Sequence, residues 1–587
     1  MRVRQILAVL SIFTALTGAA PSPSPSPSCS SWSSRLNASI AGVCVCNATH
    51  CDELSDEYRS LRMDQLGVFQ TSRSGDRLHY STVALQNTPL TDDGTAVLTI
   101  DPAVSFQTIA GFGGAITDAV AINLHRMEPA VQQRILAAYF GATGLGYSII
   151  RVPIGSTDFS ERIYSYNPVV GDLNMTNFSI DIDKSNETHK LATIHRALNM
   201  STRPVRLFAS SWAPPAWMTR ENTTQNCRVI GEPGGPYWKA LALYYSRFLD
   251  EYKREGITFW AMTTQNEPIR QALAPKEWQS LRFNTTEERD FIKYDLGPLL
   301  NERHPEVQLI IYDDQKDVLN KWTAALDDAD ARQYIRGAGV HWYKNLEFLG
   351  DSELSGHFDE LAKFHARYPD VFLLATEACA GAMPDGIATG AGPKLLNDSI
   401  TWTRGEIYAR DIIGDLANFA VGWTDWNMVL NTQGGPSWVE NFVDAPILVD
   451  HEGGREFYKQ PMYYVMGHFA KFVPPGSVRV ALNASRDAAF QRVDRVAFRT
   501  PAPANQLIVV LNNRNDKEVS FVLRDAATGF NARLTMPPNA IQTLLVGGSS
   551  ASKDQAQQEG SKSGAQVATT PITLVSLLLG LSTLWMR

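Results

Sequence analysis

A repeated strand-and-helix unit limits what this chain can fold into. Between residues 101 and 428, a short apolar or β-branched run, a loop and a stretch with helical spacing recur eight times. Alternation of this kind predicts a parallel sheet, and eight repeats predict a closed (β/α)8 TIM barrel. One connecting helix is clear, because Pro129 suits a first helical turn and Gly141 ends the apolar pattern that follows. The eight runs are 108–111, 147–152, 205–209, 259–264, 307–312, 338–342, 372–375 and 420–424.

The segments on either side of this repeat alternate apolar and polar residues, as antiparallel strands do. Three such runs precede it, at 68–70, 78–85 and 96–100, with Ser74-Gly75-Asp76 as a turn. Neither flank is large enough to form a buried sheet alone, so we expect one all-β, immunoglobulin-like sandwich with the barrel inserted between its halves. The runs after the repeat are 478–481, 496–498, 507–511, 519–523, 532–535 and 541–545.

The composition excludes several kinds of function. The 587 residues include 53 Lys and Arg against 61 Asp and Glu, a formal net charge of −8, and no basic run interrupts them. Such a chain is not built to bind the phosphate backbone of nucleic acid. The run from Gly111 to Gly114 lacks a glycine at the third glycine position of the Gly-X-Gly-X-X-Gly pattern of a dinucleotide loop, and the 11 His residues show no metal-binding spacing. We therefore expect no cofactor, no metal and no nucleic-acid partner.

Both ends of the chain resemble processing signals. A basic start, a short apolar stretch and small residues predict a signal peptide over 1–20, and a Pro/Ser linker follows at 21–28. At the other end a polar linker, 548–571, precedes an apolar tail, 572–587, which resembles a signal for a glycolipid anchor; a plain membrane anchor or a core helix is the alternative. These features predict the secretory pathway and the cell surface or extracellular space, with the lysosome or vacuole as the alternative.

The cysteines and glycosylation sites agree with export. Four of the six cysteines lie in one short segment, at Cys29, Cys44, Cys46 and Cys51. Their clustering predicts two disulfides, and metal binding is the weaker alternative because only His50 lies nearby. Cys227 and Cys379 are expected to remain free. Ten Asn-X-Ser/Thr sites occur, at Asn37, Asn47, Asn174, Asn177, Asn186, Asn199, Asn222, Asn284, Asn397 and Asn483.

Polar and aromatic side chains follow the predicted barrel strands, where the active site of such a barrel lies. Indoles, carboxylates and amides together are typical of sugar binding, because rings stack on aromatic faces and hydroxyls take paired hydrogen bonds. Glycoside hydrolysis needs two carboxyl groups, and Glu267 and Glu377 follow the fourth and seventh strands, across the barrel mouth. A salt bridge is the structural alternative for either residue, and their pairing favours catalysis. The strand-end residues are Arg151, Asp158, Phe159, Trp212, Asn266, Glu267, His341, Trp342, Tyr343, Glu377, Asp425, Trp426 and Asn427.

Longer motifs narrow this reading to one family. Thr264-Gln265-Asn266-Glu267-Pro268 resembles the acid/base motif of retaining barrel glycosidases, and Ala375-Thr376-Glu377-Ala378-Cys379 resembles a nucleophile motif. The sequences CVCNATHC from Cys44, GFGGAITD from Gly111 and VGWTDWN from Val421 resemble the glucosylceramidases of glycoside hydrolase family 30. The matches run from Cys29 to about Leu545, so they cover nearly the whole mature chain.

The resemblance implies a retaining reaction on a β-glucoside such as glucosylceramide, a glycolipid met at a membrane surface. It implies that Glu377 is the nucleophile and Glu267 the acid/base. Activity should then follow a bell-shaped pH profile with an acidic optimum. Further residues match family positions that hold the glucose or lie near the nucleophile. They are Asp158, Trp212, Asn266 and Trp426 for the glucose, and Arg151 and Tyr343 near Glu377.

The resemblance also implies disulfides and domain limits. Its cysteine pairing would join Cys29 to Cys44 and Cys46 to Cys51. The expected units are a small disulfide-bearing sheet (29–56 with 428–450), the sandwich (57–104 with 476–547) and the catalytic barrel (105–427 with 451–475).

The aglycone end departs from the animal enzymes of the family. Ile269-Arg270-Gln271 and Trp278 differ from the residues expected there. A sterol glucosidase or a secreted β-1,6-glucanase of the same family therefore stays open. A non-catalytic glycan-binding protein is the alternative from another class, and the presence of both Glu267 and Glu377 argues against it.

Overall fold

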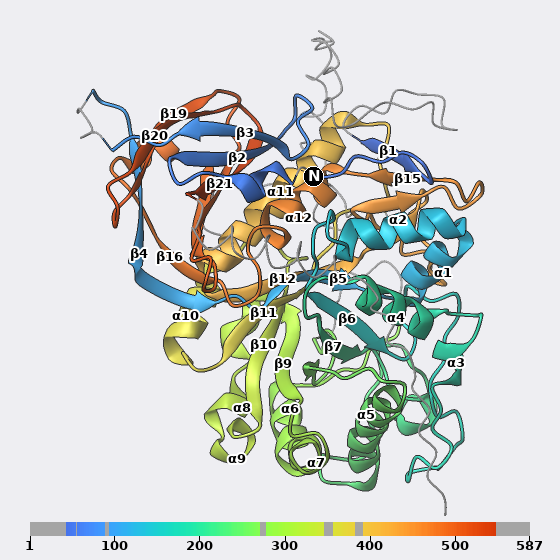
Figure 1. Ribbon diagram of the computed structural model, residues 1–587. Helices are drawn as coiled ribbons and strands as arrows, with labels where there is room; N and C mark the ends of the chain where they lie inside the picture. The colour runs from blue at the N-terminus through green and yellow to red at the C-terminus, as the bar shows by residue number, and fades with distance from the viewer. Residues whose placement is uncertain are drawn as a thin grey trace, which may run out of the picture.

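The computed structural model describes residues 43–54, 56–87, 93–269, 277–345, 356–381 and 391–547. The predicted signal peptide, both linkers and the apolar tail lie outside these residues. Among the described residues, three groups of strands form a closed barrel, a nine-stranded sheet and a four-stranded sheet (Figure 1). The predicted fold class is confirmed.

The barrel has eight parallel strands that neighbour one another in chain order. Seven of the eight predicted runs fall on these strands. The first, 108–111, is wrong: Thr108 ends a strand of the nine-stranded sheet, and the barrel begins at Gly111, in a glycine-rich run that resembles a loop. The strands are β5 (Gly111–Ala115), β6 (Ile149–Ile154), β7 (Arg206–Ser211), β8 (Ala261–Thr263), β9 (Gln308–Gln315), β10 (Ile335–His341), β11 (Phe372–Glu377) and β12 (Ala420–Asn427).

The barrel interior is layered. Six strands each contribute one residue to a buried apolar cluster near their amino ends: Ile149, Phe208, Ala261, Ile310, Leu374 and Val421. Side chains alternate along a strand, so the next inward residue lies two positions on. In β6, β7 and β8 those residues are Arg151, Ser210 and Thr263, which are all buried. The buried apolar cluster therefore lies beneath a layer of polar side chains at the carboxyl ends of the strands.

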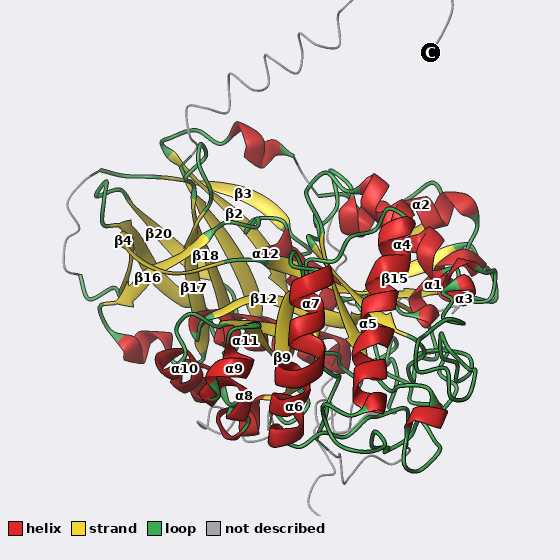
Figure 2. Ribbon diagram, turned by 90° about the horizontal axis from the view of Figure 1, so that it is seen from below, coloured by secondary structure: helices red, strands yellow, loops and turns green. Residues whose placement is uncertain are grey.

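Helices cover the outside of the barrel (Figure 2). The predicted helix after Pro129 is confirmed as α2, which ends at Phe140 before Gly141. The helices are α1 (Asp118–Arg126), α2 (Pro129–Phe140), α3 (Asp181–Lys184), α4 (Lys190–Met200), α5 (Pro236–Arg254), α6 (Thr285–Phe291), α7 (Gly297–Arg303), α8 (Ala324–Asp327), α9 (Ala329–Arg332), α10 (Phe358–Arg367), α11 (Asp398–Ala417) and α12 (Pro461–Ala470).

Strands from both flanks of the barrel form the nine-stranded sheet, as predicted, and they share one apolar core. β4 joins the two flanks, because it pairs with β16 antiparallel and with β19 parallel. The barrel is therefore inserted in the sandwich. In spatial order the strands are β20 (Asn531–Met536), β19 (Val519–Asp525), β4 (Val97–Thr108), β16 (Val478–Ala484), β17 (Val493–Arg499), β18 (Leu507–Asn513), β21 (Ala540–Val546), β2 (Gln65–Ser72) and β3 (His79–Ala84).

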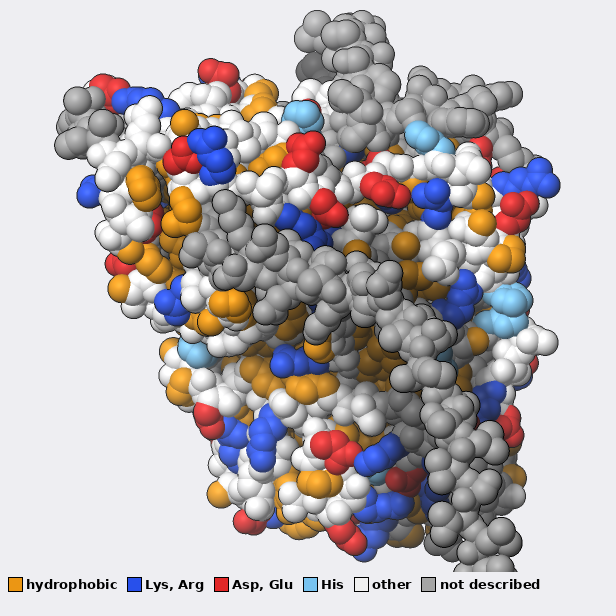
Figure 3. All heavy atoms as spheres, viewed as in Figure 1, with side chains coloured by type: hydrophobic (Ala, Val, Ile, Leu, Met, Phe, Trp, Pro, Cys, Tyr) orange, Lys and Arg blue, Asp and Glu red, His pale blue; other side chains and the backbone are white. Residues whose placement is uncertain are grey.

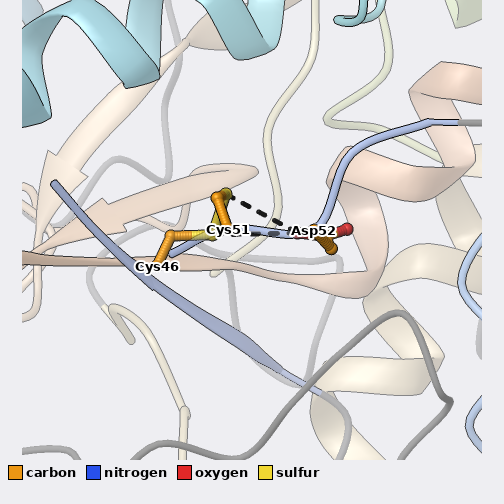
Figure 4. A group of neighbouring side chains, drawn as sticks. All are labelled: Cys46, Cys51 and Asp52. Atoms are coloured by element: carbon orange, nitrogen blue, oxygen red, sulfur yellow. Dashed lines mark hydrogen bonds between the residues drawn. A yellow bond between two sulfur atoms is a disulfide. The ribbon is translucent and has the colours of Figure 1, made fainter. Parts of the chain in front are cut away.

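The small sheet carries the predicted disulfide between Cys46 and Cys51 (Figure 4). Asp52 lies beside it and accepts hydrogen bonds from Lys459 Nζ at 3.0 Å and from Tyr464 at 2.8 Å. The predicted partner of Cys44, Cys29, lies outside the described residues. The sheet also takes in β15, a segment that we had expected in the barrel. Its strands are β1 (Cys44–Asn47), β15 (Glu456–Lys459), β14 (Ile447–Val449) and β13 (Val429–Asn431).

Surface properties fit the composition. Basic and acidic side chains are interspersed on the face shown in Figure 3.

Cys227 and Cys379 are free and buried, as predicted. Within the described part of the chain, none of the helices has both the length and the apolarity that a bilayer crossing requires.

Candidate active site

Glu377 is the last residue of β11 and lies at the carboxyl end of the barrel. Its side chain is 7% exposed. Arg151 from β6 pairs with Oε2, and the Tyr343 hydroxyl donates to Oε1 at 2.7 Å. Burial raises the pKa of Glu377, while Arg151 and His341 act against that rise. The structure thus places Arg151 and Tyr343 against Glu377.

Glu267 follows β8 in a left-handed backbone conformation, with φ of 42°. Its N–H donates to the carbonyl oxygen of Asp313 at 2.9 Å, which fixes the turn. Two side chains contact its Oε1: Gln315 Nε2 donates at 2.8 Å, and His341 Nδ1 lies at 3.0 Å. One oxygen of Glu267 is therefore held from the protein side, while its Oε2 atom has no such contact within the described part of the chain.

Asp313 links the surroundings of both glutamates. Its Oδ2 accepts from Arg151 Nη2 at 2.9 Å, and its Oδ1 lies 3.0 Å from His341 Nε2. Its side chain is fully buried. Burial alone would raise the pKa of Asp313, but Arg151 and His341 bring that pKa well below its usual range.

The aromatic residues form one side of the site. The rings of Trp212 and Trp426 stack with centroids 4.9 Å apart, and Phe159 meets Trp426 edge to face. The Arg151 guanidinium carbon lies 5.0 Å from the Trp212 ring centroid and 5.4 Å from that of Trp426. Both indoles are almost fully buried and, with the guanidinium of Arg151, form an aromatic wall of the site.

Two further predicted residues contact polar partners. Asp158 accepts from Asn441 Nδ2 at 2.8 Å, and burial raises the pKa of Asp158 to about 7. Asn266 accepts from Arg151 Nη2 at 2.8 Å, and its own N–H donates to the Ser211 carbonyl oxygen. The structure therefore brings most of the predicted side chains together at the carboxyl end of the barrel. Asp425 and Trp342 instead contact Tyr408 of α11, and Asn427 accepts a hydrogen bond from Thr117.

Several residues of the site were missed by the sequence analysis. Asp313, Asp314 and Gln315 follow the fifth predicted run and are the last three residues of β9. Asn441 lies in the loop between β13 and β14. His341 was predicted at a strand end, without an assigned role. The available signal was the polar Asp-Asp-Gln sequence that follows the apolar residues of the fifth strand.

The chemistry of the site favours ion pairs over a metal centre. One ligand atom from each of Glu267, His341 and Glu377 lies within 4.8 Å of the others, a spacing that metal ligands also show. Both His341 nitrogens, however, face carboxylates, and the Arg151 guanidinium lies on Glu377. Each carboxyl group thus contacts a basic side chain of the protein, and these side chains form an ion-pair network.

Comparison with known proteins supplies the family. The glycosyl hydrolase family 30 TIM-barrel domain matches residues 109–473, and the β-sandwich domain of the same family matches residues 476–544. The chain belongs to glycoside hydrolase family 30. It is therefore a glycosidase, with its barrel and sandwich in the order of that family.

Individual relatives agree with this membership. The chain is 38% identical over 512 residues to the lysosomal acid glucosylceramidase of Mus musculus, covering 86% of this chain and 93% of the relative. It is 25% identical over 446 residues to an endo-1,6-β-D-glucanase of Neurospora crassa, covering 74% and 85%. Among solved structures, SrfJ from Salmonella typhimurium aligns with a TM-score of 0.71 at 26% identity, covering 82% and 99%. The family 30 enzyme described here is a hydrolase that acts on glucosides.

Proposed function

We propose that this enzyme hydrolyses the β-glucosidic bond of glucosylceramide with retention of configuration. The observation that carries the proposal is the short separation of its carboxyl groups, since oxygens of Glu267 and Glu377 lie within 4.8 Å. Retaining glycosidases hold the two groups about 5–5.5 Å apart, whereas inverting enzymes need about 6.5–9.5 Å to admit a water. The spacing leaves room for direct attack on the sugar.

The two glutamates take different roles in this proposal. Glu377 attacks the anomeric carbon, and the Arg151 guanidinium and the Tyr343 hydroxyl hold its oxygens for that attack. Glu267 protonates the leaving oxygen and later removes a proton from the attacking water. Because Gln315 and His341 both contact its Oε1, the Oε2 atom is the one that carries the transferred proton.

The order of the strands separates a glucose side from an aglycone side. β9 and β10 lie between β8 and β11 on one side of the barrel, while β12, β5, β6 and β7 lie on the other. Three of the four residues proposed to hold the sugar, Trp426, Asp158 and Trp212, come from β12, β6 and β7 or the loops after them, and the fourth, Asn266, follows β8 beside Glu267. We therefore place the glucose on that side and the aglycone over β9 and β10.

Hydrogen bonds between three loops close the glucose side, which favours removal of a single terminal glucose. Trp438 Nε1 donates to Thr157 O and Gln279 Oε1, each at 3.0 Å. Gln279 Nε2 donates in turn to Ser156 Oγ at 2.9 Å. A glucan chain continuing past the bound glucose would have to pass through these bonded loops. This argues for a monoglucosylated lipid over an internal position of a β-1,6-glucan.

A substrate comparison tests the proposal. The full chain, secreted from cells, is assayed at a pH of about 5 with fluorescent glucosylceramide, a sterol glucoside and soluble β-1,6-glucan. We expect hydrolysis of glucosylceramide and release of β-glucose as the first anomer seen by NMR. Cleavage of the sterol glucoside alone would show that the aglycone of the natural substrate is a sterol and not ceramide. Cleavage of the glucan alone would move the enzyme to cell-wall polymers, and initial release of α-glucose would overturn the retaining mechanism.

A further inference from the structure

Asp313 contacts two basic side chains, and each of these also contacts one of the two glutamates. Arg151 contacts Asp313 through Nη2 and Glu377 through Nη1. His341 contacts Asp313 through Nε2 and Glu267 through Nδ1. The five side chains form one continuous chain of ionic contacts: Glu377, Arg151, Asp313, His341 and Glu267.

The contacts of His341 define its charge. A neutral imidazole donates through one nitrogen only, whereas both nitrogens of His341 face carboxylate oxygens at 3.0 Å. Burial would lower the pKa of His341, but Glu377, Asp313 and Glu267 raise it to about 10. His341 therefore carries a positive charge in the acidic range and donates to both neighbours.

A charge sum over the five groups shows what Asp313 contributes. With Glu377 ionised and Glu267 protonated, two cations balance two anions and the buried site is neutral. During glycosylation, Glu377 forms a bond to the anomeric carbon as the glycosidic bond breaks, and the Glu267 proton passes to the leaving oxygen. One negative charge disappears at Glu377 and one appears at Glu267, so the site stays neutral.

Other titratable groups around this chain do not change the sum at acidic pH. Burial, with Glu267 adding to it, raises the pKa of Asp314 to about 7, and burial raises that of Asp158 to the same value. Burial also raises the pKa of Tyr343 and of Cys379 well above their usual values. Glu288, behind β8 and β9, has a raised pKa for the same reason and bonds to Thr264 and Trp322 outside the site.

We propose that Asp313 is the positioning residue that keeps this buried site electrically neutral through both steps of the reaction. It touches neither the reacting carbon nor the leaving oxygen, and it acts through Arg151 and His341. This inference rests on the proposed roles of Glu267 and Glu377. An uncompensated charge in a buried site is costly, so loss of Asp313 should shift the proton equilibria of the whole cluster.

Two single variants should move the pH profile in opposite directions. Asp313→Asn leaves one excess positive charge, so the cluster releases its protons more readily. The acidic and basic limbs of the pH profile of kcat/KM should both move to lower pH, by about one pH unit. His341→Gln leaves one excess negative charge, and both limbs should move up by a similar amount. The double variant restores neutrality, and its limbs should return to the wild-type positions although its activity is lower.

A matched control separates charge from packing. Ser210 Oγ donates to the same Asp313 oxygen at 2.8 Å, so Ser210→Ala removes a neutral contact without changing the charge, and its limbs should not move. Limbs that stay in place in Asp313→Asn, or a double variant that keeps a shifted profile, would overturn the proposal. If one single variant fails to fold, the direction of the other still decides.

The controls also distinguish this inference from the proposed function. Turnover by Glu267→Gln and Glu377→Gln at wild-type rates would overturn the assignment of the catalytic pair itself. Inactive glutamate variants beside an unmoved Asp313→Asn profile would reject the role of Asp313 alone.

Discussion

Glu377 and Glu267 carry the same functional group in different surroundings. Both oxygens of Glu377 are held, one by the Arg151 guanidinium and one by the Tyr343 hydroxyl. Among the residues that the structure describes, only Oε1 of Glu267 has contacts of this kind, with Gln315 and His341. A carboxylate held at both oxygens is positioned to attack, whereas a carboxyl group with one oxygen open is positioned to transfer a proton.

The two amide variants should therefore differ in how they fail. Glu377→Gln should remove turnover of every substrate at every pH, because an amide does not form the glycosyl ester. Glu267→Gln should lower kcat on glucosylceramide by roughly 10²–10⁴-fold, since the leaving oxygen is no longer protonated. With a dinitrophenyl β-glucoside, it should still show a burst of dinitrophenolate, because that leaving group needs no proton.

An exposed glutamate provides the control for these variants. Glu277, on the loop after β8, is exposed, so Glu277→Gln should keep the wild-type rate on both substrates. Equal losses by Glu267→Gln on the natural and the activated substrate would argue against its role as an acid.

At the scale of the element, β9 explains why Asp313 escaped the sequence analysis. Regular alternation from the inward-facing Ile310 would turn Tyr312 inward, yet Ile311 and Tyr312 both pack in the outer core. Tyr312 and Asp313 have φ of 75° and 55°, and the pairing with β10 shifts register at this point. A bulge thus turns Asp313 inward. An apolar pattern predicts strands and their ends, as it did for Glu267 and Glu377, but not an inserted residue.

β5 is the other strand that the apolar pattern of the sequence did not reveal, because it is rich in glycine. Gly113 pairs with Ile149 of β6, and a Cβ at this position would lie 1.8 Å from the Ile149 carbonyl oxygen. Backbone atoms cannot move aside as the end of a side chain can. We expect Gly113→Ala to lower the free energy of unfolding by about 3 kcal/mol or more, measured by urea denaturation.

Gly67 of β2 is the matched control for this substitution. Its added Cβ would meet side-chain atoms at 3.3 Å or more, so Gly67→Ala should cost less than about 1 kcal/mol. If Gly113→Ala unfolded at the wild-type urea concentration, the explanation for the glycine-rich strand would be wrong.

For the whole molecule, the sequence predicted the insertion of the barrel but not the long-range pairings that complete it. Two incomplete sets of strands implied a shared sandwich, and β2 does pair with β21 across the intervening barrel. The same reasoning left β15 with the barrel, because a short apolar segment does not reveal its partner. Such pairings depend on residues hundreds of positions apart, which local spacing does not encode.

A buried histidine joins the barrel unit to the sandwich. His468 of α12 contacts Thr543 of β21 through Nδ1 and Thr71 of β2 through Nε2, each at 2.8 Å. The residue is fully buried, and burial lowers its pKa to about 3. In the unfolded chain the pKa of a histidine is about 6.5. Between these values the unfolded chain binds a proton that the folded protein does not, so stability falls as the pH falls.

This histidine should make the protein less stable in acid. Lowering the pH from about 7 to 5 should cost the wild type about 2 kcal/mol more than it costs His468→Gln, because glutamine takes up no proton on unfolding. Urea denaturation of both proteins at the two pH values measures the difference. His79→Gln, at an exposed position of β3 in the same sheet, should keep the wild-type dependence. The dependence of the free energy of unfolding on pH measures the protons taken up on unfolding. Equal losses in the wild type and His468→Gln would therefore show that another group governs stability in acid.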